Sequence, residues 1–343
     1  MIEFQHGPVV LTEKWIENQK SWLSKEFKRI DMSNLKLLEI NFKGWYCPIS
    51  QYVFMINWNG SINSGICANV MHTTSKDPWW NKTSLEISDL NTCNRVKGDC
   101  YCDADIYMPK AIDKKVFDWF TNNKPSRDNF NTLPLVEEDD HIIAMSNKDN
   151  IWAETHFHIG KRCNFNCSYC SPIWVHDNYS PDMSMQYFKH ALNLIEPHMP
   201  NNKRLILTGG EPTLNPKLFD MIKYAKEKLK YMVFVSTNGT SSITKMTNLL
   251  KYGINLQISL HIEFTKEILV RKIATLIDMY HGQIQVKVMS LPGTEFAQFI
   301  DSILPKWADI HHYPIYGQDI IGGNFNNIQP QTFTEMKQNV RIN

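Results

Sequence analysis

The sequence predicts an α/β protein whose larger part is a partial barrel of six strand–helix units, with a smaller α+β domain before it. From Glu154 to Gly317, short runs rich in β-branched and aromatic residues alternate with segments of helical periodicity. Such alternation implies a parallel sheet, because each crossover carries a helix over the sheet face. At roughly 30 residues a unit, this region holds six units, fewer than the closed eight-unit barrel of about 250 residues. A doubly wound open sheet has the same local pattern and remains the alternative.

The predicted strands and helices alternate along the whole region. Strands are expected at residues 154–160, 203–210, 231–239, 254–261, 283–290 and 309–317. Helices are expected between them, at residues 183–199, 216–230, 242–253, 265–281 and 295–308. Loops at the carboxyl ends of parallel strands converge on the barrel axis, so that end is where chemistry is expected.

The N-terminal part lacks this alternation. Residues 12–30 have the pattern of an amphipathic helix, and residues 52–67 that of a hairpin turning at Asn59 and Gly60. A polar stretch with two prolines follows and is typical of a linker. The predicted organisation is an N-terminal α+β domain at 1–120, a linker at 121–150, the partial barrel at 151–318 and a C-terminal tail at 319–343.

Charge and hydropathy exclude several classes of partner. Lys plus Arg number 36 and Asp plus Glu number 35, so no net field draws the protein to a large nucleic acid or an anionic membrane. No 18-residue apolar stretch occurs, and the first residues do not resemble a secretory signal. We therefore expect a soluble cytoplasmic protein.

Three of the eight cysteines stand in one loop directly after the first predicted strand. Cys163, Cys167 and Cys170 are spaced by four and three residues. In a reducing compartment such a group indicates metal or redox chemistry rather than disulfides. Thiolates suit zinc or an iron–sulfur cluster. A zinc site needs a fourth ligand, which His156 or His158 could supply, whereas a cubane cluster on three cysteines leaves one iron open.

This loop resembles the signature of the radical S-adenosylmethionine (radical SAM) superfamily. That family carries a CxxxCxxC triplet after the first strand of a partial (β/α)6 TIM-type barrel, with an aromatic residue, here Tyr169, before the last cysteine. Three further motifs match in order at the next strand ends: "LTGGEPTL", "VSTNGT" and "ISLH". The resemblance implies that the three cysteines hold a [4Fe-4S] cluster whose open iron chelates SAM.

The resemblance also assigns roles to the second motif. Gly209, Gly210 and Glu211 are expected to meet the methionyl amino group of SAM. Glycines let backbone carbonyls approach closely, and a carboxylate balances the ammonium. Pro212 is expected to fix the turn as the chain leaves the strand.

Residues at the next two strand ends complete the predicted SAM site. By position in the family pattern, Ser236, Asn238 and Ser259 are expected at the ribose and carboxylate of SAM. Arg271 is either a carboxylate-binding residue, as in some relatives, or a solvated helix charge. The resemblance implies that one electron cleaves SAM to methionine and a 5′-deoxyadenosyl radical, which abstracts hydrogen from the substrate. The electron is expected from an external donor such as flavodoxin or ferredoxin.

The other five cysteines suggest a second cluster in the N-terminal domain. Their layout resembles the auxiliary modules called SPASM or twitch, although those modules usually follow the barrel and space their last cysteines differently. A zinc site or buried thiols are the alternatives. The candidate ligands of this auxiliary [4Fe-4S] cluster are Cys47, Cys67, Cys93, Cys100 and Cys102.

An auxiliary cluster favours oxidative modification of a peptide or a small metabolite, because it can accept an electron from the substrate radical. Two alternatives remain from the sequence. One is a radical SAM enzyme acting on a nucleoside or nucleobase, and the other is a non-catalytic iron–sulfur electron-transfer protein. The complete series of SAM-site motifs favours the enzyme.

Overall fold

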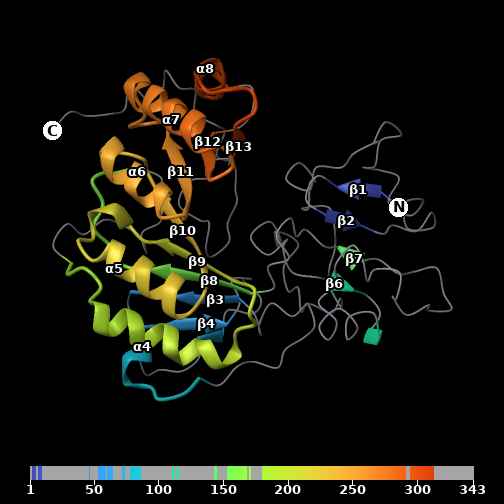
Figure 1. The fold of residues 1–343 in the computed structure, drawn as a ribbon, viewed down its shortest axis with the longest axis vertical. Coiled ribbons are helices and arrows are strands. Elements are labelled where there is room, and N and C mark those ends of the chain that lie inside the picture. Colours follow the sequence, from blue (N-terminus) through green and yellow to red (C-terminus); the bar gives the residue numbers. More distant parts are fainter. Residues whose placement is uncertain are drawn as a thin grey trace, which may run out of the picture. The chain divides into compact units, whose positions relative to one another are not determined.

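The structure is a computed structural model whose described residues cover most of the predicted barrel and shorter pieces before it (Figure 1). The chain divides into two compact units, which are described separately. The N-terminal unit comprises Met1–Thr155 with Asn193–Arg204, and the barrel unit comprises His156–Leu192 with Leu205–Asn343. The residues described are 2–4, 7–9, 46, 53–58, 60–64, 72–73, 78–85, 110–111, 114–115, 143–144, 153–167, 170, 180–290 and 294–312.

All six predicted strands and all five predicted helices form. The strands are β8 (Ala153–His158), β9 (Lys203–Thr208), β10 (Met232–Thr237), β11 (Asn255–His261), β12 (Ile284–Met289) and β13 (Asp309–His312). The helices are α4 (Met185–Ile195), α5 (Leu218–Lys223), α6 (Ile243–Lys251), α7 (Glu267–Met279) and α8 (Glu295–Ile303). A π-helical segment, η7 (Tyr224–Lys228), continues α5, and a 3-10 turn, η5 (Glu196–His198), follows α4.

The order of the strands decides between the two sheet topologies that the sequence left open. Strands β8 to β13 are hydrogen-bonded neighbours in chain order, and β10 to β13 pair in parallel. A doubly wound sheet reverses direction at a switch point, so its strand order is not sequential. The doubly wound alternative is therefore wrong, and the sheet is singly wound as a partial barrel requires.

The two faces of this sheet differ in chemistry. Along β12, Ile284, Val286 and Val288 are buried, while the residues between them are only half-buried. The apolar face lies under the helices: a Cβ on Gly239, which has a φ of +74°, would lie 2.9 Å from Ile258 of β11 and 3.3 Å from Ile273 of α7. Each such side chain buried contributes about 1.5–3 kcal/mol. The alternate residues of each strand face the interior of the partial barrel.

One electrostatic interaction across the sheet is consistent with a curled sheet. Burial and, secondly, the charge of Lys287 on β12 lower the pKa of His156 on β8 to about 3. In a flat sheet β8 and β12 would lie about 19 Å apart, which exceeds the screening length of about 10 Å. Curvature brings the two inward side chains close, as expected for a partial barrel.

The N-terminal unit contains the predicted hairpin. Strands β3 (Val53–Ile56) and β4 (Ile62–Ser64) pair antiparallel, and β4 pairs with β5 (His72–Thr73). The Asn57 N–H donates to Ser61 O at 2.8 Å, and Gly60 adopts a φ of +95°. Trp79, fully buried, donates its indole N–H to Asn57 O at 3.1 Å and so packs on the turn. The hairpin prediction is confirmed.

Several short elements complete this unit. Strand β3 is the neighbour of β8, whose first residues belong to the same unit. A 3-10 turn, η2 (Trp79–Asn81), carries the buried tryptophan. Two further antiparallel pairs join β1 (Ile2–Phe4) to β2 (Gly7–Val9) and β6 (Lys110–Ala111) to β7 (Ile143–Ala144). The predicted helix at 12–30 lies outside the described residues, and the predicted domain boundaries stay predictions.

No helix within the described part of the chain is long and apolar enough to cross a bilayer.

Candidate active site

The cysteine loop leaves the carboxyl end of β8, as predicted. Its three cysteines are half-buried and form no disulfide. The Cys170 N–H donates to Cys167 O at 3.1 Å, and the Phe165 N–H donates to Cys163 Sγ at 3.4 Å. Burial raises the pKa of Cys163 and of Cys170, and the nearby Cys163 charge raises the pKa of Cys170 further. The hydrogen bond from Cys170 to Cys167 therefore forms a turn that joins these two cysteines.

The two glycines after β9 lie directly beneath this loop. The Gly210 N–H donates to Gly160 O at 3.0 Å, and the Glu211 N–H donates to Arg162 O at 2.7 Å. A Cβ on Gly209, at a φ of +143°, would lie 2.3 Å from Gly160 O, and a Cβ on Gly210 would lie 2.3 Å from Arg162 O. Any side chain at either position would therefore displace the cysteine loop. The sequence predicted glycines for approach to SAM, and it missed their contact with the loop.

Glu211 ties the end of β9 to the end of β10. Its carboxylate is buried, and Oε1 accepts from Thr213 N at 2.9 Å, Thr213 Oγ1 at 2.5 Å and Thr237 Oγ1 at 2.7 Å. Oε2 accepts from Asn238 N at 2.7 Å. Because a carboxylate offers about four acceptor positions, only Oε2 keeps room for the ammonium that the sequence assigned to Glu211.

Asn238 ties the loop after β10 to the cysteine loop. Its Nδ2 donates to Asn164 Oδ1 at 2.8 Å, and Asn164 Nδ2 donates to Thr240 Oγ1 at 2.8 Å. Thr240 closes the ring by donating to Asn238 Oδ1 from N at 3.1 Å and from Oγ1 at 2.6 Å. A hydrogen bond from Asn238 also lowers the pKa of Cys163, against the larger effect of burial. Asn238, predicted as a SAM contact, therefore also positions the cysteine loop.

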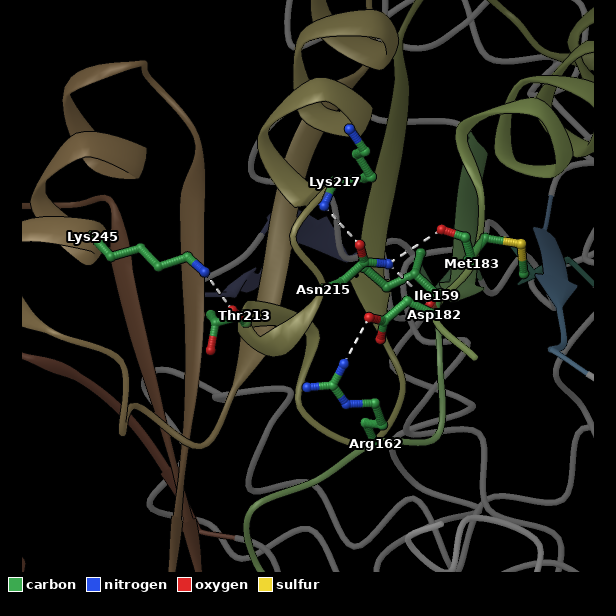
Figure 2. A network of polar contacts seen from close by, with 8 residues as sticks. All are labelled: Ile159, Arg162, Asp182, Met183, Thr213, Asn215, Lys217 and Lys245. Carbon is green, nitrogen blue, oxygen red and sulfur yellow. Dashed lines mark hydrogen bonds and ion pairs between the residues drawn. The ribbon is translucent and has the colours of Figure 1, made fainter. Parts of the chain in front are cut away.

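A separate network holds both ends of the cysteine loop (Figure 2). Arg162 and Asp182 form an ion pair at 2.8 Å that spans the loop from its start to its end. Buried Asn215 donates from Nδ2 to Ile159 O and to Met183 O, both at 3.4 Å. The Met183 N–H also donates to Ile159 O at 3.1 Å. The base of the loop is therefore closed by hydrogen bonds from the segment that follows the GGEP turn.

His261, at the carboxyl end of β11, contacts the cysteine loop and was not among the predicted site residues. Its Nδ1 lies 3.5 Å from Cys167 Sγ. Its ring packs edge-on against Phe165 at a centroid distance of 5.8 Å, and Phe165 stacks on Phe264 at 4.7 Å. Burial lowers the pKa of His261 to about 4, so the ring is neutral at pH 7. Only its place at the end of the "ISLH" strand pointed to it in the sequence.

The remaining predicted residues fall into three places. Ser236 and Ser259 lie on the inward face of β10 and β11, since they alternate with buried residues. Pro212 opens the buried 3-10 turn η6 (Pro212–Leu214). Arg271 lies on the exposed surface of α7, where it pairs with Glu267 at 2.6 Å. This position fits a solvated helix charge, and among the described contacts it does not join the other predicted residues.

Six predicted positions lie outside the described residues: Tyr169, Cys47, Cys67, Cys93, Cys100 and Cys102.

The donor set of the loop fits an iron–sulfur cluster. Among the described residues, no three His, Cys, Asp or Glu side chains are already gathered as a metal site. Three half-buried thiols on one loop, however, are the ligands that a cubane cluster with one open iron needs. His156 and His158, the alternative zinc ligands, lie on β8, where His158 is buried and His156 is half-buried, and burial lowers the pKa of each to about 3.

Comparisons with known proteins found a matching family and similar solved structures. Residues 157–277 match the family described as the radical SAM superfamily. A search of curated proteins found no match. A crystal structure of BtrN in complex with AdoMet and 2-DOIA is similar over 55% of this chain and 82% of its own, at 16% identity and a TM-score of 0.33. Native anSMEcpe with bound AdoMet is similar over 48% and 51%, at 14% identity and a TM-score of 0.39.

Proposed function

We propose, from the match of residues 157–277 to the radical SAM superfamily, that the chain is an enzyme that oxidatively modifies a peptide or a small metabolite. The carrying observation is the cysteine loop, held over the GGEP turn by backbone hydrogen bonds at 2.7 and 3.0 Å. A [4Fe-4S] cluster bound there would supply the electron that cleaves SAM into methionine and a 5′-deoxyadenosyl radical.

The chain's own residues hold the reactants in this proposal. Cys163, Cys167 and Cys170 would hold the cluster through three thiolates, and one iron would be left for SAM. Glu211 accepts the methionyl ammonium at Oε2, which has one protein donor at 2.7 Å. Burial of that carboxylate, 2% exposed, excludes water that would compete with the ammonium.

Two rows of inward side chains support a polar substrate. Strand register places four residues in one row, Ser236, Gln257, Gln285 and Asp309, and three in the next, Ser259, Lys287 and His311. Lys287 Nζ donates to Gln257 Oε1 at 3.2 Å, and Gln257 Nε2 donates to Gln285 Oε1 at 3.3 Å. Closed barrels fill their inner layers with branched apolar side chains, which a polar interior does not resemble.

We infer from these rows that the substrate has hydrogen-bonding groups and an anionic group that faces Lys287. Ser236 lies at the β10 end of the first row and Ser259 at the β11 end of the second row, and we assign both to SAM. Strand β12 contributes Gln285 to the first row and Lys287 to the second row, and we assign these two residues to the substrate. A peptide segment or a polar metabolite provides such groups.

The second cluster belongs to the same proposal. Four of Cys47, Cys67, Cys93, Cys100 and Cys102 would hold it. Hydrogen abstraction leaves a substrate radical, and loss of one electron and one proton then gives a product oxidised by two electrons. An auxiliary cluster held by these cysteines would supply the acceptor for that electron. A flavodoxin or ferredoxin supplies the electron that SAM cleavage consumes.

Anaerobic reconstitution with iron and sulfide tests the function. We expect about eight irons per chain for two cubanes, and dithionite-dependent formation of 5′-deoxyadenosine. Replacing Cys163, Cys167 and Cys170 together by alanine should leave about four irons and abolish cleavage. Protein that binds only zinc, or that binds iron without cleaving SAM, would contradict the proposal.

A further inference from the structure

We propose that His261 donates a hydrogen bond from Nδ1 to the sulfur of Cys167 and thereby raises the reduction potential of the cluster in the cysteine loop. This inference rests on the proposed function, because it requires a cluster bound by Cys167. It assigns His261 as a positioning and tuning residue that acts through a cluster ligand.

The geometry suits a hydrogen bond to sulfur. Nδ1 lies 3.5 Å from Cys167 Sγ, which is within the range of contacts that sulfur accepts. A thiolate that binds a metal has no proton to donate, so in the loaded protein Nδ1 must carry the proton. A ring that carries a proton on Nδ1 can then donate to this sulfur.

The ring is held in this orientation by its neighbours. Phe165, two residues before Cys167, meets the His261 ring at 82° and stacks on Phe264. Strand register pairs His261 with Met289, which is on the inward face of β12. His261 therefore reaches the cysteine loop from the inside of the barrel, across 94 residues of sequence.

The direction of the effect follows from charge. One-electron reduction adds negative charge to the cluster and its sulfurs, so a donor stabilises the reduced state more than the oxidised state. Hydrogen bonds to the sulfurs are among the factors that set cluster potentials. Cys163 receives its donor from the Phe165 backbone, whereas Cys167 receives one from a side chain that can be replaced.

Two variants separate donation from packing. His261→Phe keeps an aromatic ring beside Phe165 and removes the N–H, while His261→Gln keeps a side-chain N–H. The measurement is a redox titration of the reconstituted full chain. The reduced cluster is quantified by its EPR signal, and the cluster of the cysteine loop is recognised because its signal changes when SAM is added. At a fixed potential, we expect the reduced-to-oxidised ratio to fall about three- to tenfold in His261→Phe. Tenfold corresponds to a midpoint lower by about 59 mV for one electron.

His261→Gln should restore most of the ratio. An unchanged midpoint in His261→Phe would overturn the inference, as would equal shifts in both variants. A second measurement uses the unaltered protein: 15N-labelled histidine should give a hyperfine coupling to the reduced cluster, and its absence would also overturn the inference. Failure of the unaltered protein to bind iron or cleave SAM would instead refute the proposed function.

Discussion

Replacing Glu211 by glutamine tests the tie between the ends of β9 and β10. The carboxylate is 2% exposed and accepts hydrogen bonds from Thr213, Thr237 and Asn238. An amide has one acceptor oxygen, so its NH2 group must face at least one of these donors. In the less costly arrangement the NH2 group replaces Oε2 and meets the buried Asn238 N–H.

The expected loss follows from those contacts. A hydrogen bond to a charged acceptor contributes about 1.5–3 kcal/mol, and a buried donor without an acceptor costs about 1–3 kcal/mol. These two terms overlap, so we expect Glu211→Gln to lower the free energy of unfolding by about 3 kcal/mol. With a urea dependence of about 3 kcal/mol per molar, the midpoint falls by about 1 M.

The assay is anaerobic urea unfolding of the full chain without cluster, and unfolding is monitored by far-UV circular dichroism. Glu267→Gln is the matched control, because Glu267 is 57% exposed on α7 and pairs only with exposed Arg271 among the described ion pairs. That change should cost under about 0.5 kcal/mol. If Glu211→Gln shifts the midpoint no more than the control does, Glu211 is not a structural tie.

Four further predictions follow from the same contacts. Gly210→Ala should displace the cysteine loop, because its Cβ would lie 2.3 Å from Arg162 O, and should lower the iron bound per chain. Arg162→Gln should cost under about 1 kcal/mol, since Arg162 is 37% exposed, yet it should speed iron loss to a chelator; an unchanged rate would argue against a clamp. Lys287→Gln should raise KM for an anionic substrate more than it lowers kcat, as steady-state kinetics would show. The pKa of His156 and of His158 is lowered to about 3 in the folded protein. As the pH falls, these two histidines are therefore protonated in the unfolded chain before they are protonated in the folded protein. Stability should therefore be complete above pH 6.5 and fall below it by about 1.4 kcal/mol per pH unit for each histidine, measured by urea unfolding from pH 7 to 4.

The strands and helices of the barrel could be predicted because each has its own periodic pattern of buried residues. Along β12, alternate residues are buried, and α7 buries Leu269, Val270, Ile273 and Leu276 on one side. Such patterns are local, since side-chain direction repeats every 2 residues in a strand and every 3.6 in a helix. The hairpin at Gly60 could likewise be predicted from neighbouring residues alone. The order of the strands in the sheet depends on residues far apart along the chain, so two topologies remained open until the strand pairing was known.

Site prediction placed residues at the strand ends but did not give the protein contacts of their side chains. Glu211 was assigned to SAM, yet it accepts four hydrogen bonds from the protein, two of them from residues 26 and 27 positions away. Asn238 binds Asn164 across 74 positions. No sequence window contains such pairs, because they form only when neighbouring strands bring their ends together.

By itself, the sequence determined the strand–helix alternation, the three thiols that follow the first strand and the GGEP turn after the second. Local periodicity and residue chemistry are sufficient for those features. Only the tertiary structure decided that the sheet is singly wound, that its inner rows are polar and that His261 reaches Cys167. Those features depend on strand register and sheet curvature, which set distances between residues that are far apart along the chain.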